Sequence, residues 1–186
     1  MRVIAGKARR IQLVTPEGMN TRPTTDRIKE TLFNMINSDL YACRFLDLFS
    51  GSGGIGIEAL SRGAVFCTFV ESDSEAVRCI CQNLKKTRLE GQSEIIRSDA
   101  VAAVKSLCTK GTKAYDFIFM DPPYNHLYER DVLTALKDTD LVDGNTTIII
   151  EASLNTDTAY INDFGFHIDK IKEYKTNKHI FVSKKS

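Results

Sequence analysis

An Asp-Pro-Pro-Tyr sequence at positions 121–124 carries the side chains of this chain that are best suited to chemistry. It follows residues 115–120, a short apolar run typical of a buried strand. Proline lacks an N–H group and fixes φ, so the backbone must leave the sheet at the carboxyl end of that strand, where ligands bind in open α/β sheets. Asp121, the Pro122 carbonyl and the Tyr124 ring would then share one rim. This set suits a flat heterocycle with an exocyclic amine, and an ordinary proline turn is the alternative.

A glycine-rich segment at positions 45–56 is the second candidate for chemistry. Its order predicts a strand, a turn that a ligand approaches closely, and a helix whose free N–H groups favour an anionic group such as a carboxylate. Glu71 ends the next predicted strand, 20 positions after Gly51, a spacing that suits a carboxylate bonded to ribose hydroxyls. Asp99 follows the third predicted strand and would meet an adenine edge.

Two cofactors compete for this segment. Gly51, Gly53 and Gly56 match the dinucleotide fingerprint, so an NAD(P)-dependent oxidoreductase is a rival interpretation. Asp47, at the preceding strand end, would place extra negative charge beside a dinucleotide, whereas it would favour the ammonium group of S-adenosylmethionine. The chain also has no room for a separate substrate domain. The sequence therefore predicts S-adenosylmethionine, held by Asp47, Gly51, Gly53, Glu71 and Asp99.

Short apolar strands alternate with helices from residue 44 onward, which predicts a parallel sheet covered on both faces. The last two strands are separated by only four residues, 175–178, which is hairpin length. We expect an α/β, Rossmann-like fold of the class I methyltransferase type, with a mostly parallel seven-stranded sheet that ends in an antiparallel hairpin. The predicted strands are 45–49, 65–71, 94–97, 115–120, 146–151, 166–174 and 179–182, and the predicted helices are 54–62, 74–89, 100–109 and 127–138.

The N-terminal residues form a separate small unit in this interpretation. Residues 2–5 and 11–14 are strand candidates joined by a basic turn, and a helix follows with Thr25 as its N-cap. We expect residues 1–24 to be a basic hairpin extension and residues 25–186 to be the main domain. The apolar face of the helix is predicted to consist of Ile28, Leu32, Met35 and Ile36.

Charge is unevenly distributed along the chain. The formal net charge is +1, but residues 1–30 carry seven Lys/Arg against three acidic residues, so this segment is +4 and the remainder −3. A basic arm on a near-neutral body suggests a polyanionic partner, and a solvated charged face is the alternative. The basic residues assigned to such a partner are Arg2, Lys7, Arg9, Arg10 and Arg22.

Composition narrows the class of protein. Hydrophobic residues make up 42% and charged residues 26% of the chain, as in soluble globular proteins, and no apolar run reaches the ~20 residues of a membrane helix. We also see no signal peptide. The five cysteines fit no disulfide or zinc pattern and indicate reduced thiols in a cytoplasmic protein. The three histidines are scattered, so we predict no metal site.

Taken together, three segments resemble the RsmD family of 16S ribosomal RNA guanine-N2 methyltransferases. These are Arg-Pro-Thr-Thr-Asp-Arg at 22–27, Asp-Leu-Phe-Ser-Gly-Ser-Gly at 47–53 and the motif at 121–124, and the likeness extends over nearly the whole chain. One departure is Lys175 after Tyr174, where relatives tend to place glycine.

The resemblance implies methyl transfer from S-adenosylmethionine to the exocyclic N2 of one guanine in small-subunit rRNA. Asp121 and the Pro122 carbonyl would accept the two amine hydrogens, and Tyr124 would stack on the base. The implied partner is ribosomal RNA, within an assembling small subunit, and the implied state is a monomer. The cofactor-binding set that follows is Asp47, Phe49, Gly51, Gly53, Glu71 and Asp99.

Several alternatives stay open at this point. An N6-adenine methyltransferase acting on DNA or RNA uses the same kind of motif, and an RNA-associated domain without catalysis is also compatible. Arg22 would contact RNA or pair with a carboxylate near the cofactor. Glu151 ends the fifth predicted strand at the same rim and has no assigned role.

Overall fold

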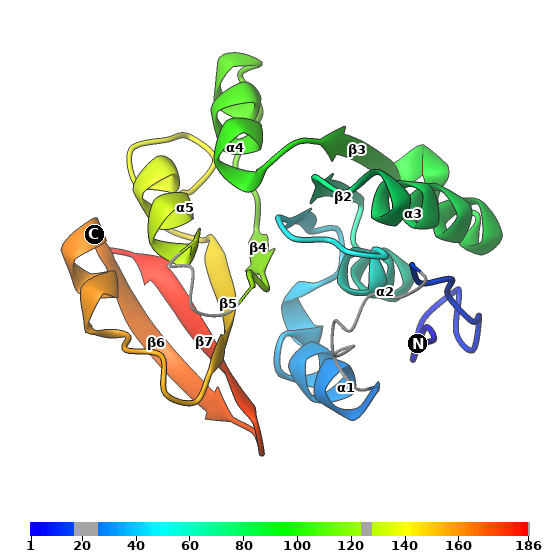
Figure 1. Ribbon diagram of the computed structural model, residues 1–186, viewed down its shortest axis with the longest axis horizontal. Coiled ribbons are helices and arrows are strands. Elements are labelled where there is room, and N and C mark those ends of the chain that lie inside the picture. The colour runs from blue at the N-terminus through cyan, green and yellow to red at the C-terminus, as the bar shows by residue number, and fades with distance from the viewer. Residues whose placement is uncertain (17–25, 124–127, 186) are drawn as a thin grey trace. The chain divides into compact units, whose positions relative to one another are not determined.

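The computed structural model describes residues 1–16, 26–123 and 128–185 (Figure 1). The chain divides into two compact units, Met1–Ser98 and Asp99–Ser186. No helix within the described residues has the length and apolar character needed to cross a membrane.

The first unit contains three parallel strands in the order β3-β2-β1. A helix joins each strand to the next, as the sequence predicts, and the helix after β1 packs on both β1 and β2. The elements are α1 (Asp26–Met35), η1 (Asn37–Asp39), β1 (Arg44–Asp47), α2 (Gly54–Arg62), β2 (Phe66–Glu71), α3 (Ser74–Thr87), η2 (Glu90–Gln92) and β3 (Ser93–Arg97).

Strands β1 and β2 form the core of this unit. Phe45 and Leu46 of β1 and Phe69 and Val70 of β2 are all fully buried. Because successive side chains on a strand point to opposite faces, burial of adjacent residues means that both faces are covered. This explains why these strands are short and almost wholly apolar, while the polar residues that follow them come at the strand ends.

The second unit contains four strands in the order β4-β5-β7-β6, of which β4 and β5 are parallel and the last two pairings are antiparallel. Helices α4 and α5 pack against each other, and α5 also contacts the 3-10 helix η3. The elements are α4 (Ala100–Thr109), β4 (Phe117–Met120), α5 (Tyr128–Leu136), β5 (Thr147–Ser153), η3 (Ala159–Phe164), β6 (Phe166–Glu173) and β7 (Asn177–Lys184).

The predicted fold class is confirmed, because the seven strands belong to a mostly parallel α/β sheet that ends in an antiparallel hairpin. Helices 54–62 and 100–109 have the predicted bounds. The terminal hairpin is tighter than predicted, since β7 already begins at Asn177 and the Tyr174 N–H donates to the Asn177 carbonyl at 2.8 Å. Lys175 has no positive φ, so this turn needs no glycine there.

The predicted N-terminal strands were wrong in extent. Residues 2–5 and 11–14 share a single antiparallel bridge, between Arg2 and Gln12. The physical reason is that other backbone groups of this segment bond to the body of the first unit. The N–H groups of Ile4 and Ala5 donate to a glutamate of α2, and the N–H of Val14 donates to a side chain of α3.

Helix α1 begins at Asp26, and its predicted N-cap, Thr25, lies outside the described residues. Of the predicted apolar face, Leu32 and Ile36 are buried. Two residues of the helix that the prediction left out, Lys29 and Phe33, are fully buried as well. A fully buried lysine needs a polar partner inside the protein, and helical periodicity alone could not identify that partner.

Candidate functional site

The glycine-rich turn after β1 is held in place by hydrogen bonds among its own residues. Ser50 Oγ donates to the Asp47 carbonyl at 2.8 Å, and the Gly53 N–H donates to the Ser50 carbonyl at 2.7 Å. Gly53 is the N-cap of α2 with φ of +81°, a conformation that a residue with a side chain rarely adopts. A Cβ there would also lie 3.3 Å from Ile57 and Phe69. Glycine is therefore required for the turn to enter the helix.

The Asp47 carboxylate is buried at the end of β1, with only 1% of the residue exposed. Its Oδ2 accepts a hydrogen bond from the Gly56 N–H at 3.1 Å, whereas Oδ1 has no hydrogen-bond partner among the described residues. Burial raises the pKa of Asp47 to about 7, the Gly56 bond opposes this, and the charge of Glu71 adds to it. A buried acid with one unpaired oxygen fits a cationic donor such as an ammonium group.

Glu71, at the end of β2, bonds to the same turn. Its Oε2 accepts from the Gly51 N–H at 2.8 Å and its Oε1 accepts from the Asp73 N–H at 2.9 Å. Each carboxylate oxygen has a second lone pair for a hydroxyl group. The structure thus brings Asp47, Gly51 and Glu71 around one turn, as the 20-residue spacing predicted, and Phe49 lies half-buried within it.

Asn83 is a residue of this turn that sequence reasoning missed. It is fully buried in α3, and its Nδ2 donates to the Ser52 carbonyl and to the Val14 carbonyl, both at 2.9 Å. Its Oδ1 accepts from the Val14 N–H at 2.7 Å. The amide therefore ties the glycine-rich turn to the N-terminal segment. An asparagine on the buried face of an amphipathic helix was the available signal.

Asp99 is the N-cap of α4 and the first residue of the second unit. Its Oδ1 accepts from the Ala102 N–H at 2.9 Å, a standard helix-capping bond. The residue is exposed. Its contact with an adenine edge stays a prediction.

The Asp-Pro-Pro motif follows β4, whose four residues are all buried. Asp121 is half-buried, Pro122 is buried and Pro123 is exposed, so the chain leaves the sheet at the prolines as predicted. Tyr124 lies outside the described residues, and its stacking role stays a prediction.

Beside this motif, the second unit contains a buried polar cluster. Glu151 of β5 accepts from Asn177 Nδ2 at 2.6 Å and lies 3.1 Å from His179 Nε2. The other ring nitrogen of His179, Nδ1, is 3.1 Å from the Tyr174 hydroxyl. The sequence predicted that the strand ends at Glu151, but β5 continues to Ser153. None of these partners was predicted, because they come from the antiparallel hairpin.

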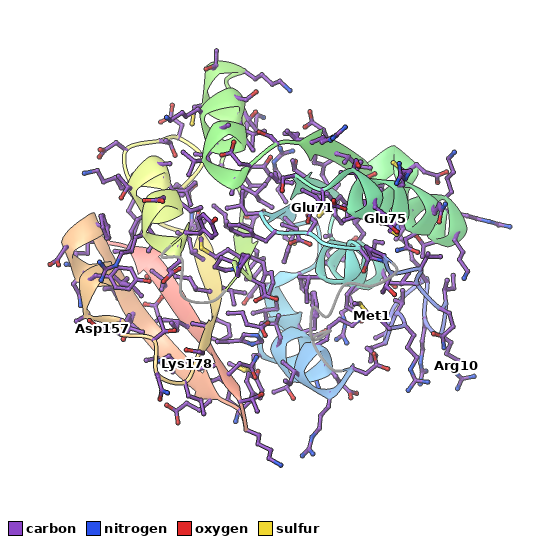
Figure 2. All side chains as sticks on the ribbon, in the orientation of Figure 1. Met1, Arg10, Glu71, Glu75, Asp157 and Lys178 are labelled. Carbon is purple, nitrogen blue, oxygen red and sulfur yellow. The ribbon has the colours of Figure 1, made fainter. Side chains whose placement is uncertain are left out.

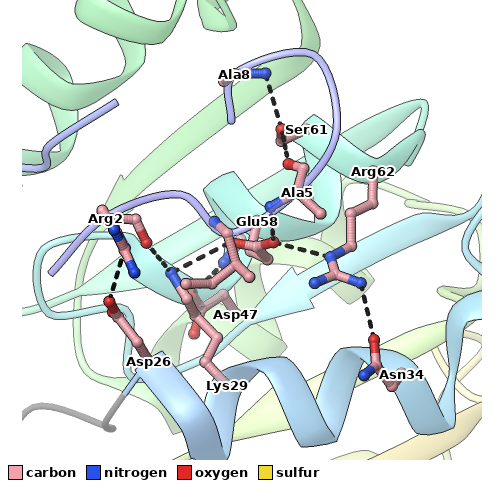
Figure 3. Close-up of polar contacts among 12 residues, drawn as sticks. Arg2, Ala5, Ala8, Asp26, Lys29, Asn34, Asp47, Glu58, Ser61 and Arg62 are labelled. Carbon is pink, nitrogen blue, oxygen red and sulfur yellow. Dashed lines mark hydrogen bonds and ion pairs between the residues drawn. The ribbon is translucent and has the colours of Figure 1, made fainter. Parts of the chain in front are cut away.

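The N-terminal segment is fastened to α2 by Glu58 (Figure 3). This fully buried carboxylate accepts from the N–H groups of Ile4 and Ala5 at 2.8 and 3.0 Å and pairs with Lys29 and Arg62 at 3.2 and 2.8 Å. Lys29 also donates to the Arg2 carbonyl at 2.6 Å. Burial lowers the pKa of Lys29, and Glu58 opposes this.

The residues predicted to contact RNA differ in their surroundings. Arg2 pairs with Asp26 at 3.1 Å on the surface, and Lys7 Nζ donates to Gln92 Oε1. Arg9 and Arg10 are exposed, and Arg10 lies at the margin of the first unit (Figure 2). Arg22 lies outside the described residues. Lys29, which contributed to the basic count of this segment, is buried and faces α2 instead of solvent.

A family model described as Conserved hypothetical protein 95 matches residues 1–183. The chain is 40% identical to YlbH of Bacillus subtilis over 151 residues, 81% of this chain and 82% of that one. It is 31% identical to ribosomal RNA small subunit methyltransferase D of Escherichia coli K12 over 172 residues, 92% of this chain and 84% of the relative. The chain belongs to the RsmD family.

The likeness to a solved structure described as a putative methyltransferase extends over the whole chain. The Escherichia coli protein yhhF superposes with a TM-score of 0.84 at 25% identity, covering 100% of this chain and 98% of the other. Family membership confirms the prediction of an S-adenosylmethionine-dependent methyltransferase with a Rossmann-like fold and removes the oxidoreductase alternative. The unpaired oxygen of Asp47 fits that cofactor, because its ammonium group supplies the missing donor.

Proposed function

We propose that this RsmD-family protein transfers a methyl group from S-adenosylmethionine to the exocyclic N2 of one guanine in small-subunit ribosomal RNA. The name of the Escherichia coli relative supports ribosomal RNA as the substrate class. The observation that carries the cofactor assignment is Asp47, a buried carboxylate with an oxygen that no described residue satisfies.

In the first unit, the residues around the glycine-rich turn would hold the cofactor, which supplies an electrophilic methyl group on a sulfonium. Asp47 Oδ1 would accept from the ammonium group, and the backbone at Gly51 and Gly53 would line the path of the cofactor chain. The Gly51 N–H holds Glu71, whose remaining lone pairs would accept hydrogen bonds from ribose hydroxyls. Phe49 lies in the same turn, and Asp99 is assigned to the adenine edge.

In the second unit, Asp121 and the Pro122 carbonyl would bind the amine. The lone pair of guanine N2 is delocalised into the ring, so the amine is a poor nucleophile. Two acceptors for its two hydrogens favour a lone pair localised on nitrogen and directed at the methyl carbon. The nitrogen–carbon bond forms as the carbon–sulfur bond breaks, and the amine proton leaves to Asp121 or to water.

Tyr124 is assigned to stack on the target base. A base in a helix must first be turned out of its stack, which costs a few kcal/mol. Stacking on one aromatic ring returns about 1–3 kcal/mol, so Tyr124 would offset much of this.

The basic N-terminal segment is assigned to the RNA backbone through Arg2, Lys7, Arg9, Arg10 and Arg22. Its attachment to α2 through Glu58 supports this role, because a fixed segment presents its charges at less cost in conformational entropy than a free arm. We further propose that the protein acts as a monomer in the cytoplasm, on an assembling small subunit. The extension is assigned to residues 1–24 and the methyltransferase domain to residues 25–186.

The decisive experiment offers tritium-labelled S-adenosylmethionine with free ribosomal RNA and with small-subunit particles, followed by digestion to nucleosides. We expect label in N2-methylguanosine. Label in N6-methyladenosine would establish the adenine alternative, and cofactor binding without any transfer would establish an RNA-associated domain. Mapping the labelled guanosine then identifies the target.

A further inference from the structure

We infer that the Tyr174 hydroxyl is a hydrogen-bond acceptor for the N1–H group of the target guanine, and that Glu151 and His179 orient it for this purpose. The inference deepens the proposed function and rests on it. It assigns to the second unit a residue that selects guanine over adenine, which the Asp-Pro-Pro-Tyr motif does not do.

The hydrogen bonds among Asn177, Glu151 and His179 indicate to which atom the Tyr174 hydroxyl donates its proton. Asn177 Nδ2 donates to Glu151 Oε1, and the second oxygen, Oε2, lies 3.1 Å from His179 Nε2. A carboxylate only accepts, so Nε2 carries the imidazole proton. We assign Nδ1 as the acceptor of the ring, so that the Tyr174 hydroxyl, 3.1 Å away, donates to it.

The hydroxyl oxygen of Tyr174 is left with lone pairs and no proton to offer a ligand. Burial, together with the charge of Glu151, raises the pKa of Tyr174 to about 12, so the hydroxyl keeps its proton near neutral pH. The ring is half-buried, whereas Glu151 and His179 are buried. An accessible group that accepts and does not donate recognises an N–H.

Strand register places His179, the partner of this acceptor, two strands from the amine-binding motif. Met120 of β4 pairs with Ile150, and Glu151 of β5 pairs with His179 of β7. Strands lie about 4.8 Å apart, so the backbone at position 179 is about 10 Å from that at Asp121. Tyr174 follows β6, whose Glu173 pairs with Lys178 of β7, and its hydroxyl lies 3.1 Å from the His179 ring.

Asp121 and His179, the ring that contacts the Tyr174 hydroxyl, lie on the same face of the sheet. The rings of Phe119 and His179 are in edge contact, with centroids 6.1 Å apart. Side chains alternate along a strand, and a residue before proline stays extended, so Asp121 lies on the face of Phe119. The β6–β7 hairpin that carries Tyr174 and His179 is visible in Figure 1, and Lys178, next to His179, is labelled in Figure 2.

Guanine and adenine differ at this position. Guanine N1 carries a hydrogen next to the N2 amine, whereas adenine N1 is an acceptor. With Asp121 and the Pro122 carbonyl on the amine, an acceptor at Tyr174 completes the recognition of one edge of guanine. Adenine would face this oxygen with a lone pair, and an acceptor left without a donor in the complex discriminates strongly.

The test crosses a protein change with a substrate change. The protein change is Tyr174→Phe, and the substrate change replaces the mapped guanosine by 2-aminopurine riboside through ligation of the ribosomal RNA. 2-Aminopurine keeps the 2-amine but lacks N1–H. We expect Tyr174→Phe to lower kcat/KM about tenfold on the guanine RNA and less than about twofold on the 2-aminopurine RNA.

Tyr160→Phe is the matched control, since it removes a hydroxyl from another buried tyrosine of the same unit, in η3. It should leave both rates unchanged, and circular dichroism should show that both variants are folded. Equal losses on the two RNAs, or no loss on the guanine RNA, would overturn the role of Tyr174 alone. No transfer by the unaltered protein to the guanine RNA would overturn the proposed function, and this inference with it.

Discussion

Glu58 and Asp47 are two buried carboxylates of the first unit, and they differ in how far the protein satisfies them (Figure 3). Glu58 accepts two backbone N–H bonds and pairs with Lys29 and Arg62. Asp47 accepts one bond, from the Gly56 N–H, and its Oδ1 has no partner among the described residues.

This difference separates a structural acid from a ligand-binding acid. A buried charge is tolerated when it is paired and fully hydrogen-bonded, as Glu58 is, and the residue then contributes to folding. A buried carboxylate with an unpaired oxygen is destabilising unless something else supplies a donor. Asp47 sits beside a glycine-rich turn, so a bound ligand is the natural source of that donor.

The largest effect is expected at Glu58. Glu58→Ala should lower the free energy of unfolding by about 3–5 kcal/mol, because it leaves Lys29 buried without its acid and two backbone N–H groups without acceptors. Urea titration measures this. Glu90→Ala, at an exposed acid of the same unit, should change it by less than about 0.5 kcal/mol. Equal effects of the two changes would show that Glu58 has no special role in stability.

Asp121→Ala should abolish most turnover and leave cofactor binding intact. Losing a group that binds the amine and receives its proton is expected to lower kcat by about 10²–10⁴-fold. Single-turnover kinetics with labelled S-adenosylmethionine measures the rate, and calorimetry measures the affinity. Full activity in this variant would show that Asp121 neither binds the amine nor receives its proton.

Asp47→Asn should weaken cofactor binding without loss of stability, whereas Glu58→Ala should lower stability. The amide oxygen can still accept from Gly56 and carries no charge to bury, so the free energy of unfolding should not fall and should rise at pH 7. Loss of a charge-assisted bond should weaken S-adenosylmethionine binding about 10–100-fold, measured by calorimetry. A large loss of stability with unchanged affinity would make Asp47 a structural acid as well.

The raised pKa of Asp47 predicts a pH dependence with a definite sign. The folded protein holds the Asp47 proton up to about pH 7, whereas the unfolded chain loses it near the ordinary value of 3.8. Between these pH values the folded state binds more protons, so this group's contribution to stability falls as pH rises, by at most about 1.4 kcal/mol per pH unit.

Affinity for the cofactor should change in the other direction. Binding of an ammonium group needs ionised Asp47, so the affinity for S-adenosylmethionine should rise between pH 5.5 and 7.5 by up to about tenfold per pH unit. Asp47→Asn should remove this slope as well as the slope in stability. Persistence of both slopes in that variant would assign them to another group.

The smallest effect is expected at the surface. Arg10→Ala should weaken RNA binding and reduce the dependence of log affinity on log salt by about 0.7–0.9, the contribution of one phosphate contact. Lys170→Ala, on the exposed strand β6 of the other unit, is the matched control and should leave the slope unchanged. Filter binding at several salt concentrations measures both.

Much of the fold and part of the site could be predicted because their signals are local. Pro122 and Pro123 end β4 because proline cannot continue a central strand in any fold. The glycines after Asp47 dictate a turn before α2. The helices at 54–62 and 100–109 follow from the alternation of strands and helices along the chain, and their bounds were predicted correctly. The order of strand, acid, glycine and second acid also determined which residues surround the turn.

Only the tertiary structure decided which polar side chains work inside the protein. Lys29 was indistinguishable from a solvent-facing residue of an amphipathic helix. Asn83 lies on the apolar face of α3, but its partners, distant in sequence, were known only from the fold. The partner of Glu151 could be identified only from the antiparallel hairpin, which places His179 Nε2 3.1 Å from its carboxylate. Such pairings depend on sheet register and helix packing, which join residues far apart in the chain, and no local pattern of residue types contains that information.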